Sequence, residues 1–531
     1  MRNEVACSRR AIRKFLYRGQ ILEGLGHARV FGRRVCHFHP RVKVVHNVRY
    51  HSQFCDGNLN VASDAVLQLP LELGDAVPGL SDVTSGHELF RPIHYLGSKL
   101  RLAPTIADAL DSADGDRGPV LDLFAGSGTT ALALAAHRTV IASDIQEYSR
   151  VICSALLAKP KGFSEIVSNL TADVRARSPL WEKFWFVAEP LITYERIALS
   201  EAAQGVGEPI CTVIENGSVL AAERTKSRSA PHELRVALAE TVQRMSHAQL
   251  MNSASLTAFR YFGGIYFSYE QALELDYLAA IASTYPREFK DVLTAALLST
   301  ASDVVNTVGK QFAQPIRPRN KQGIIKRHLL TKIERDRRQD VRGIYLDWLG
   351  RYAKHPASER RHQAVRADYR ESLKELSGKY SVVYADPPYT RDHYSRFYHV
   401  LETISRRDNP SIARSPGAVA DDLSRGLYRD DRHQSPFCIK SQCEEAFRDL
   451  FQLASESGAN LILSYSPFDA AAEARPRLMR IDSLIAMAEQ FYRRVELESV
   501  TGITHSKLNH TSLNFGKPDE AEVLLICRFK R

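Results

Sequence analysis

The sequence predicts an α/β protein whose doubly wound, mostly parallel sheet is interrupted by a large and mostly helical insert. Short apolar runs typical of buried strands alternate with segments of helical spacing, and these runs lie at 120–124, 139–143, 382–385 and 459–464. Such alternation is typical of a sheet covered by helices on both faces. A tight glycine-rich turn follows the first run, where a buried strand leads directly into a helix.

The composition favours a soluble protein with a polyanionic partner. The 531 residues suffice for two or three folded units, and the net charge of +10 favours nucleic acid, although a generally basic protein has much the same balance. No apolar run approaches the roughly 20 residues of a membrane span, so no membrane partner is expected. The 8 cysteines form no CxxC pairs. We therefore expect a reducing, cytoplasmic location and no metal site.

Residues 1–88 are predicted to be a basic, partly disordered N-terminal extension. The first fifty residues contain many arginines, and their only acidic residues are Glu4 and Glu23. An organelle transit peptide or a phosphate-binding arm is an alternative interpretation of this stretch. The segment before residue 90 is rich in small, acidic, Gly and Pro residues and reads as a linker.

Order is expected to begin near residue 89, in a segment that leads into the first half of the sheet at 89–155. Tyr95-Leu-Gly97-Ser98-Lys99 precedes a run of helical spacing from 100 to 110. A Gly-Ser turn that opens a helix, with a lysine beside it, suits an anionic or carboxylate ligand. Taken alone, this pattern is common among helices.

The glycine loop is the stronger signal in this half. The strand at 120–124 contains Asp122 and ends at Phe124, and Ala125-Gly126-Ser127-Gly128 leads into a small-residue helix. Glycines let the backbone approach a bound molecule, and the next strand ends in Asp144, which could accept hydrogen bonds from ribose hydroxyls. The FxGxG pattern is shorter than a dinucleotide fingerprint and fits a nucleoside without phosphates, such as S-adenosylmethionine (SAM). The alternative is a tight turn without a chemical role.

The insert, at 156–375, is predicted to be mainly helical, with helices at 178–201, 232–255, 270–283 and 286–302. Aromatic residues around Gly263-Gly264, between 257 and 268, favour a packed hairpin or loop core. From Lys310 to Arg342, eleven Lys and Arg residues accompany three acids. We expect this run, including Arg335, Arg337 and Arg338, to be a surface that follows phosphates rather than a solvated helix face.

The second half of the sheet, at 376–531, contains the turn around which the chemistry is expected. The buried run 382–385 stops at Asp386-Pro387-Pro388-Tyr389, where two prolines force the chain to turn. The turn presents a carboxylate, carbonyls and a ring, which could hold a flat molecule that carries an amino group. The residues that follow, His393, Tyr394, Arg396 and Tyr398, could hold a nucleotide or simply pack the next helix. The runs 494–501 and 521–528 are expected to form a hairpin.

Together, Phe124-Ala-Gly126-Ser-Gly128 and Asp386-Pro-Pro-Tyr389 closely resemble the motifs of the Dam-like adenine-specific (N6) SAM-dependent DNA methyltransferase family. Tyr95-Leu-Gly-Ser-Lys99 is similar to the N-terminal SAM motif of that family, and the order of motifs is the same. The resemblance implies a Rossmann-like SAM methyltransferase sheet in which 156–375 is the target-recognition insert.

The resemblance also implies roles for individual residues. Tyr95 and Lys99 would contact SAM, Asp144 would hold the ribose, and Asp386 with the Pro387 carbonyl would accept hydrogen bonds from the target amine, while Tyr389 stacks on the base. The implied catalytic residues are Asp386, Pro387, Pro388 and Tyr389, and the implied cofactor-binding residues are Tyr95, Lys99, Asp122, Phe124, Ala125, Gly126, Gly128, Asp144 and Asp386.

The implied reaction is methyl transfer from SAM to the exocyclic N6 amine of an adenine flipped out of double-stranded DNA. Such an enzyme would work in restriction-modification or phage defence in a prokaryotic cytoplasm, with a cognate restriction or defence nuclease as a possible partner. An aspartate at the first motif position favours adenine. The alternatives are a cytosine-N4 DNA methyltransferase, an adenine-N6 RNA methyltransferase, and an inactive DNA-binding protein with this fold.

Overall fold

The computed structural model describes residues 90–176, 178–225, 230–389, 391, 393–414, 423–466, 478–501 and 520–529. The basic extension expected at 1–88 lies outside these residues. Residues 67–531 form one compact unit, and every element described below belongs to it. Within the described part of the chain, no helix is long and apolar enough to cross a membrane.

A seven-stranded mixed sheet, in the order β3-β2-β1-β4-β5-β7-β6, forms the centre of the α/β part. The strands are β1 (Val120–Asp122), β2 (Val140–Asp144), β3 (Gln363–Arg366), β4 (Val382–Ala385), β5 (Asn460–Tyr465), β6 (Arg494–Thr501) and β7 (Glu520–Arg528). The first five strands are parallel, and β7 runs antiparallel to both β5 and β6. The expected α/β class and the pairing of the two C-terminal strands are confirmed.

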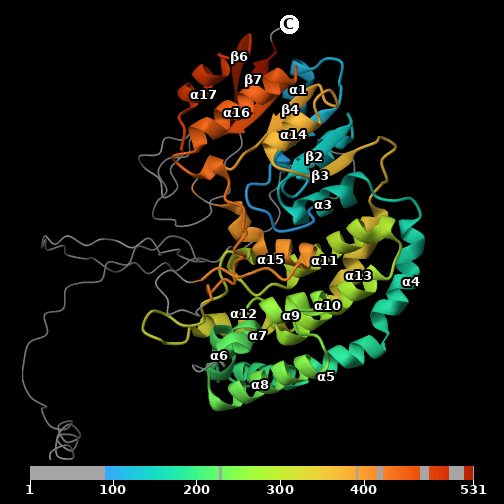
Figure 1. The fold of residues 1–531 in the computed structure, drawn as a ribbon, viewed down its shortest axis with the longest axis vertical. Coiled ribbons are helices and arrows are strands. Elements are labelled where there is room, and N and C mark those ends of the chain that lie inside the picture. The colour runs from blue at the N-terminus through green and yellow to red at the C-terminus, as the bar shows by residue number, and fades with distance from the viewer. Residues whose placement is uncertain are drawn as a thin grey trace, which may run out of the picture. The chain divides into compact units, whose positions relative to one another are not determined.

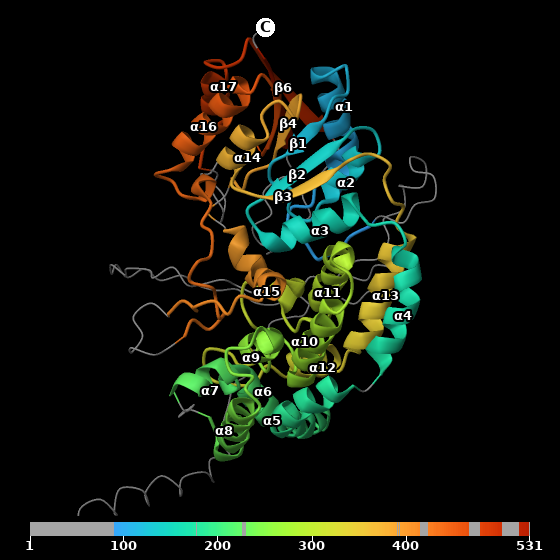
Figure 2. The ribbon, with the colours of Figure 1, turned by 45° about the vertical axis from the view of Figure 1, so that its right-hand side comes forward.

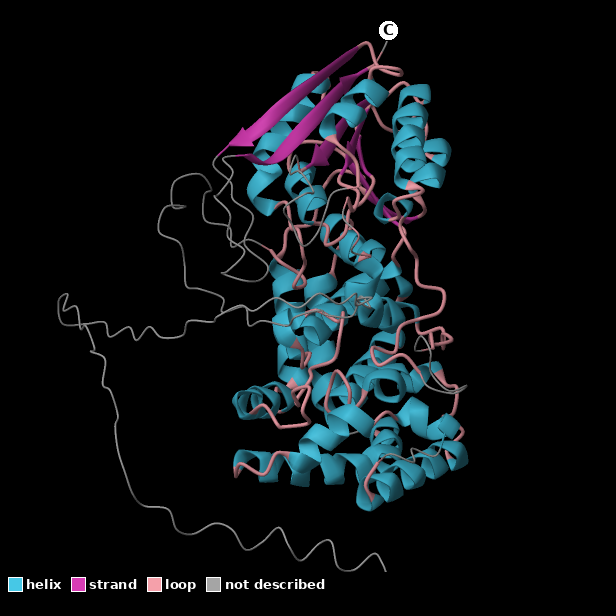
Figure 3. Ribbon diagram, turned by 90° about the vertical axis from the view of Figure 1, so that its left-hand side faces the viewer, coloured by secondary structure: helices cyan, strands magenta, loops and turns pink. Residues whose placement is uncertain are grey.

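Helices cover both faces of the sheet because successive strand residues point to opposite sides. Val120 and Val382 pack with α1 (Ala103–Ala113) and α2 (Thr129–Ala135). Leu121 and Val383 pack against the other group of helices, which consists of α14 (Tyr369–Glu375), α16 (Cys443–Glu456) and α17 (Ile481–Ala488). Figure 2 shows the strands between these two groups, and Figure 3 shows the strands in magenta.

The insert is helical, as the spacing of its apolar residues predicts. Its helices are α4 (Phe163–Arg175), α5 (Pro179–Ala203), α6 (Glu208–Asn216), α7 (Val219–Thr225), α8 (His232–His247), α9 (Thr257–Phe262), α10 (Tyr269–Ser283), α11 (Lys290–Val304), α12 (Arg327–Arg337) and α13 (Val341–Lys354). Short 3-10 turns occur at Leu100–Leu102, Ala254–Leu256, Arg287–Phe289, Val308–Lys310 and Pro436–Cys438. Ser178 caps α5 by accepting from the Trp181 amide, and Ser268 caps α10 in a reciprocal box with Gln271.

Two expectations about the insert are corrected by the structure. Residues 257–262 form helix α9 rather than a hairpin or loop, because the Asp276 carboxylate caps it by accepting from the Ala258 and Phe259 amides at 3.0 and 2.8 Å. The expected end of the insert at 375 is also too late. Strand β3 pairs with β2 and α14 packs on the sheet, so the chain has already returned to the sheet by residue 363.

Many cations of the basic run from Lys310 to Arg342 pair with carboxylates of the protein itself. Arg337, expected to contact phosphates, is 3% exposed, forms an ion pair with Glu195 and donates to the Gly264 carbonyl at 2.9 Å. The expectation for Arg337 is wrong because α12 turns this position into the helical core. Other cations of the run also have carboxylate partners: Arg319 with Glu208 and Glu215, Lys332 and Arg335 with Asp336, Arg338 with Glu334, and Arg342 with Glu274.

Two helices connect the sheet to the insert. Helix α3 (Glu147–Leu157) follows β2, and α15 (Tyr394–Arg406) follows the turn after β4. Both pack in the same apolar cluster as α11, and Figure 1 shows α15 and α11 side by side. The position of the insert relative to the sheet edge is therefore set by packed side chains on the elements that begin at that edge.

Candidate active site

The glycine loop and the Asp386 turn meet at the carboxyl edge of the sheet. Strands β1 and β4 are paired in register, with Asp122 opposite Tyr384, so the chain leaves both strands side by side. The Leu123 amide donates to the Tyr384 carbonyl at 3.0 Å, and the Ala125 amide donates to the Ser143 carbonyl of β2 at 3.1 Å. Because β1 leads outward to β2 while β4 lies on its other side, this edge is a topological switch point, where open α/β sheets bind ligands.

The glycine loop has a backbone that only glycine adopts easily. Gly126 and Gly128 have φ values of 54° and 73°. A Cβ at Gly126 would lie 2.3 Å from the Tyr95 hydroxyl oxygen, and one at Gly128 would lie 3.1 Å from the Cys153 sulfur. Side chains at these two positions would therefore collide with the residues around the loop.

Asp144, predicted to hold a ribose, also organises the loop. Its Oδ2 accepts from the Gly126 amide at 3.0 Å, and its Oδ1 accepts from the Gln146 amide at 2.9 Å. Burial raises the pKa of Asp144, which these amide hydrogen bonds oppose. Each carboxylate oxygen retains a further lone pair, so these contacts are compatible with a bound diol.

Tyr95 joins the N-terminal motif to the other side of the site. Its ring stacks on Tyr398 of α15 with the ring centres 4.9 Å apart, and the Leu96 amide donates to the Tyr398 hydroxyl at 2.7 Å. The Tyr394 ring lies 6.0 Å from Tyr95. Tyr394 and Tyr398, left open between nucleotide contact and helix packing, thus pack against the N-terminal motif.

Lys99 connects the N-terminal motif directly to the Asp386 turn. Its Nζ lies 3.2 Å from Asp386 Oδ1 and 2.9 Å from Glu522 Oε1. Burial by itself lowers the pKa of Lys99, but the carboxylates of Asp386 and Glu522 outweigh it and raise that pKa well above its ordinary value. Lys99 is therefore a buried ammonium, and its positive charge stabilises a negative charge on the Asp386 carboxylate.

Tyr389 and the two prolines complete the turn. The Tyr389 ring packs against Tyr465 of β5 with ring centres 5.0 Å apart, and Lys99 Nζ lies 5.6 Å from the Tyr389 ring centre. Burial raises the Tyr389 pKa, so its hydroxyl is neutral at physiological pH. The Pro388 carbonyl accepts a weak hydrogen bond from Cys438, which is buried beside it. The ring is thus held by neighbours from two directions.

Asp122 lies beneath the site in the sheet. It is 1% exposed, and burial, with smaller contributions from Asp386 and Asp144, raises its pKa to about 8. Phe124, two residues after the end of β1, packs against the apolar cluster that contains Tyr369, with the two ring centres 6.1 Å apart. The structure therefore brings together Tyr95, Lys99, Asp122, Phe124, Ala125, Gly126, Gly128, Asp144, Asp386, Pro387, Pro388 and Tyr389 at one edge of the sheet.

Two residues at this edge were missed by the sequence analysis. Glu522 is 1% exposed on β7, pairs with Lys99 and accepts from Ser464 at 2.8 Å. A lone carboxylate at an inward position of the otherwise apolar run 521–527 was the available signal. Asp368 follows β3 directly, and the preceding Ala367 amide donates to the Asp144 carbonyl at 3.1 Å. It therefore lies on the same edge as the predicted ribose acceptor.

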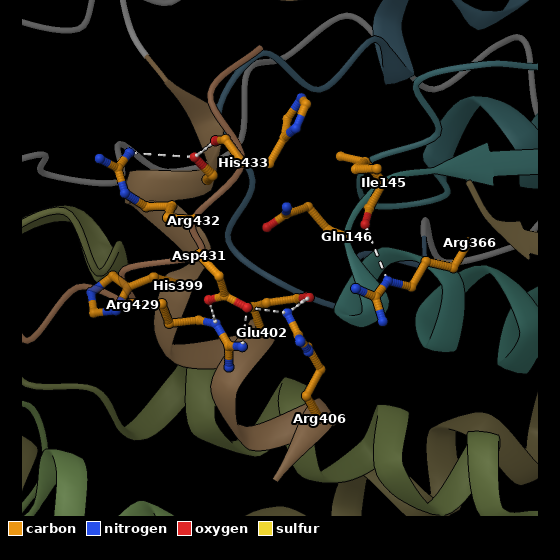
Figure 4. A pocket seen from close by; sticks show the side chains of 11 residues that line it. Ile145, Gln146, Arg366, His399, Glu402, Arg406, Arg429, Asp431, Arg432 and His433 are labelled. Carbon is orange, nitrogen blue, oxygen red and sulfur yellow. Dashed lines mark hydrogen bonds and ion pairs between the residues drawn. The ribbon is translucent and has the colours of Figure 1, made fainter. Parts of the chain in front are cut away.

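A cavity of about 250 Å³ opens beside the end of β2 (Figure 4). Ile145 and Gln146, which follow Asp144, form one wall, and Glu402, Arg432 and His433 contribute to the opposite side. Burial raises the pKa of Glu402 to about 7. The cavity thus continues the Asp144 end of the site toward α15.

The comparison with known families agrees with this geometry. The family model for D12 class N6 adenine-specific DNA methyltransferases matches residues 95–207 and 343–452. The matched segments include the N-terminal motif, the glycine loop and the Asp386 turn.

The modification methylase LlaI from Lactococcus lactis subsp. lactis is 32% identical over 119 residues, which are 22% of this chain and 16% of that protein. The chain thus matches about a sixth of the length of this relative. No solved structure matches the chain. The match to the family model confirms the resemblance predicted from the sequence: over residues 95–207 and 343–452 the chain is similar to the D12 class N6 adenine-specific DNA methyltransferases.

Proposed function

We propose that this protein transfers a methyl group from SAM to the N6 amine of an adenine flipped out of double-stranded DNA. The observation that carries the proposal is the meeting of two motifs at a switch point: β1, which leads into the glycine loop, pairs in register with β4, which leads into the Asp386–Tyr389 turn. The match to the D12 class family model supports the adenine N6 position, and the similar protein from Lactococcus lactis subsp. lactis is a modification methylase. We infer a Rossmann-like sheet in which the insert recognises the target.

The residues of the sheet edge fit SAM. The glycine loop is a cradle that a Cβ would fill at Gly126, and Asp144 keeps lone pairs for the ribose hydroxyls. Burial, and then the charges of Asp386 and Asp144, raise the pKa of Asp122, so a positively charged ligand would be favourable near these carboxyl groups. Bound SAM would supply an electrophilic methyl group on its positively charged sulfonium.

The turn residues would make the adenine amine a better nucleophile. The amine is weak because its lone pair is delocalised into the ring. Hydrogen bonds from the amine to Asp386 and to the Pro387 carbonyl would localise that pair, while Tyr389 stacks on the base. The Lys99 ammonium, 3.2 Å from Asp386, keeps this carboxylate an ionised acceptor. Positioning and electrostatics would then supply most of the rate without a strong base.

The same proposal gives the protein a biological setting. Modification by such an enzyme protects DNA from a cognate nuclease, so we propose a role in restriction-modification or phage defence in a prokaryotic cytoplasm. The proposed nuclease partner is a separate component. Co-purification of the tagged protein from its host, with identification of bound nucleases, tests that part alone.

Labelled SAM distinguishes the possible reactions. The protein is incubated with methyl-labelled SAM and either duplex DNA or RNA, and the labelled nucleosides are identified after digestion. We expect N6-methyldeoxyadenosine from DNA. Label only in RNA or in N4-methylcytosine would replace the proposal by one of those reactions, and no label under conditions where SAM binds would favour an inactive DNA-binding protein.

The variant Asp386→Asn tests the role of the turn. It keeps the shape of the side chain but removes its charge, so we expect at least a hundredfold lower kcat. SAM affinity, measured by calorimetry, should change less than tenfold because the glycine loop is intact. Near-wild-type turnover would remove Asp386 from the chemistry.

A further inference from the structure

Four arginines on three segments gather around one tyrosine outside the catalytic turn. They are Arg317, Arg396, Arg425 and Arg432, and we call them the Tyr428 arginine cluster. The Arg396 and Arg432 guanidinium carbons lie 5.3 and 5.6 Å from the Tyr428 ring centre. Arg396 Nε donates to the Tyr428 hydroxyl at 3.1 Å. Arg425 donates to the Ile316 carbonyl at 2.8 Å, next to Arg317.

The three segments are fixed against one another by hydrogen bonds. Gln314 donates to the Tyr428 hydroxyl at 2.8 Å, and the Phe312 amide donates to the Phe397 carbonyl of α15 at 3.0 Å. Arg432 donates to Ser395 in the first turn of α15 at 3.4 Å. The cluster is therefore built on the end of the insert, on α15 and on the segment 423–433, rather than on one helix.

The cluster differs from the basic run in how its charge is compensated. Among the described residues, none of the ion pairs includes a member of the cluster, whereas Arg335 and Arg337 of α12 have carboxylate partners. Glu215, the carboxylate that acts on Arg425 electrostatically, is itself paired with Arg319 at 2.9 Å.

Two properties of the guanidiniums indicate that the cluster favours an anionic ligand. Burial and then the charge of Arg396 lower the pKa of Arg432, and burial and then Arg317 lower the pKa of Arg425. The Nε of Arg432 is buried and has no hydrogen-bond partner within the described part of the chain. Like charges held together without an anion are destabilising, and an unsatisfied buried donor adds to that cost.

We propose that the Tyr428 arginine cluster binds phosphates of the DNA backbone next to the extruded adenine. Arginine forks match the geometry of phosphate oxygens, and such contacts fix register without reading sequence. This inference rests on the proposed function for the identity of the polyanion.

The cluster has a suitable position for this role. Arg396 is one helical turn into α15, whose first residue, Tyr394, packs against Tyr95 of the SAM motif. Ser395 and Arg396 thus follow directly the residues that line the site. Phosphates held there would flank a nucleotide whose base enters beside Asp386, which lowers the cost of keeping the base out of the stack.

The salt dependence of DNA binding tests the cluster. Binding of a labelled duplex to the full chain is measured at about 50 to 200 mM salt, without turnover, for wild type and for Arg396→Gln/Arg432→Gln. Each lost phosphate contact makes the negative slope of log K against log salt shallower by about 0.9. The loss of two contacts should therefore make it shallower by about 1.8. Between the lowest and the highest salt, a fourfold range, the fold-loss in affinity should then be about twelve times smaller for the variant than for wild type.

Two further double variants control for folding and for general charge. Arg396→Lys/Arg432→Lys keeps the charges and should retain most of the slope. Arg335→Gln/Arg338→Gln removes two exposed cations that already have carboxylate partners and should leave the slope near the wild-type value. An equal change in the Arg335/Arg338 variant, or an unchanged slope in the Arg396/Arg432 glutamine variant, would overturn the proposal.

The outcome is separable from that of the methyl-transfer assay. A slope that falls by about two in a protein that methylates no nucleic acid would keep the cluster as a phosphate site and remove the proposed reaction. Methylation of DNA with an unchanged slope would keep the reaction and remove the cluster. A slope change on duplex RNA but not on duplex DNA would also refute the DNA assignment.

Discussion

Glu522→Gln is the most informative single change in the site, because Glu522 lies outside all three motifs. It removes the charge from one of the two carboxylates that contact Lys99, while the side chain keeps its size and an acceptor oxygen. The other carboxylate, Asp386, remains 3.2 Å from Lys99 Nζ. The variant therefore weakens the positioning of Lys99 without emptying the core.

The expected loss of stability follows from the burial of this pair. At 2.9 Å and an effective dielectric constant of about 20, the attraction of Glu522 and Lys99 is roughly 6 kcal/mol before the cost of burying the charges. Asp386 still compensates Lys99, and the glutamine oxygen still accepts, so the net loss is that of one charged hydrogen bond, about 1.5–3 kcal/mol.

The pH dependence of the loss has a defined sign. Because the pKa of Lys99 is raised in the folded state, its contribution to stability is complete below the unfolded value of about 10.4 and is lost as pH rises through the folded value. Without the Glu522 charge, burial lowers the Lys99 pKa more effectively. The variant should therefore lose stability, and kcat for methyl transfer, at a lower alkaline pH than wild type.

The assay compares Glu522→Gln with the same substitution at Glu496 on the neighbouring strand. Glu496 is 32% exposed and pairs with Arg528 at 3.1 Å, so its loss should cost less than about 1 kcal/mol. Urea titrations give the free energies of unfolding, and initial rates across pH give kcat. Equal stabilities and equal pH–rate profiles for the two variants would refute the positioning role of Glu522.

Three other changes test the structure. Gly126→Ala should weaken SAM binding at least tenfold in calorimetry, because its Cβ would lie 2.3 Å from the Tyr95 hydroxyl oxygen at a φ of 54°; unchanged affinity would show that the loop does not form the cradle. The folded-state pKa of Asp122 is raised to about 8, so the free energy of unfolding of wild type should fall by up to about 1.4 kcal/mol per pH unit between about pH 4 and 8. Asp122→Asn removes this fall and should therefore be the more stable protein in urea titrations over that range. Equal pH dependence of the two free energies of unfolding would contradict the raised pKa. Arg337→Gln should cost about 3–5 kcal/mol by leaving Glu195 buried without its cation, and a change in DNA salt dependence alone, with normal stability, would return Arg337 to the surface.

Local patterns in the chain were sufficient to predict the α/β class and the motif residues. The strand at 120–122, the glycine loop and the turn at 386–389 depend on neighbours in sequence: buried apolar runs, glycines and two prolines. Helices such as α5 and α10 were predictable because their apolar spacing and serine caps are local as well. Helix α9 was missed because its cap, Asp276, comes from a residue 18 positions from Ala258.

The sequence by itself thus determined the class of fold, the resemblance to a family and the residues of the two central motifs. Only the tertiary structure decided which charges are available for chemistry and binding. Charge runs have no direction in sequence, so Arg337 and the scattered arginines around Tyr428 could not be separated until helices and loops were placed. Likewise, Glu522 is 423 residues from Lys99 along the chain, and only the pairing of β7 with β5 brings its carboxylate to the catalytic turn.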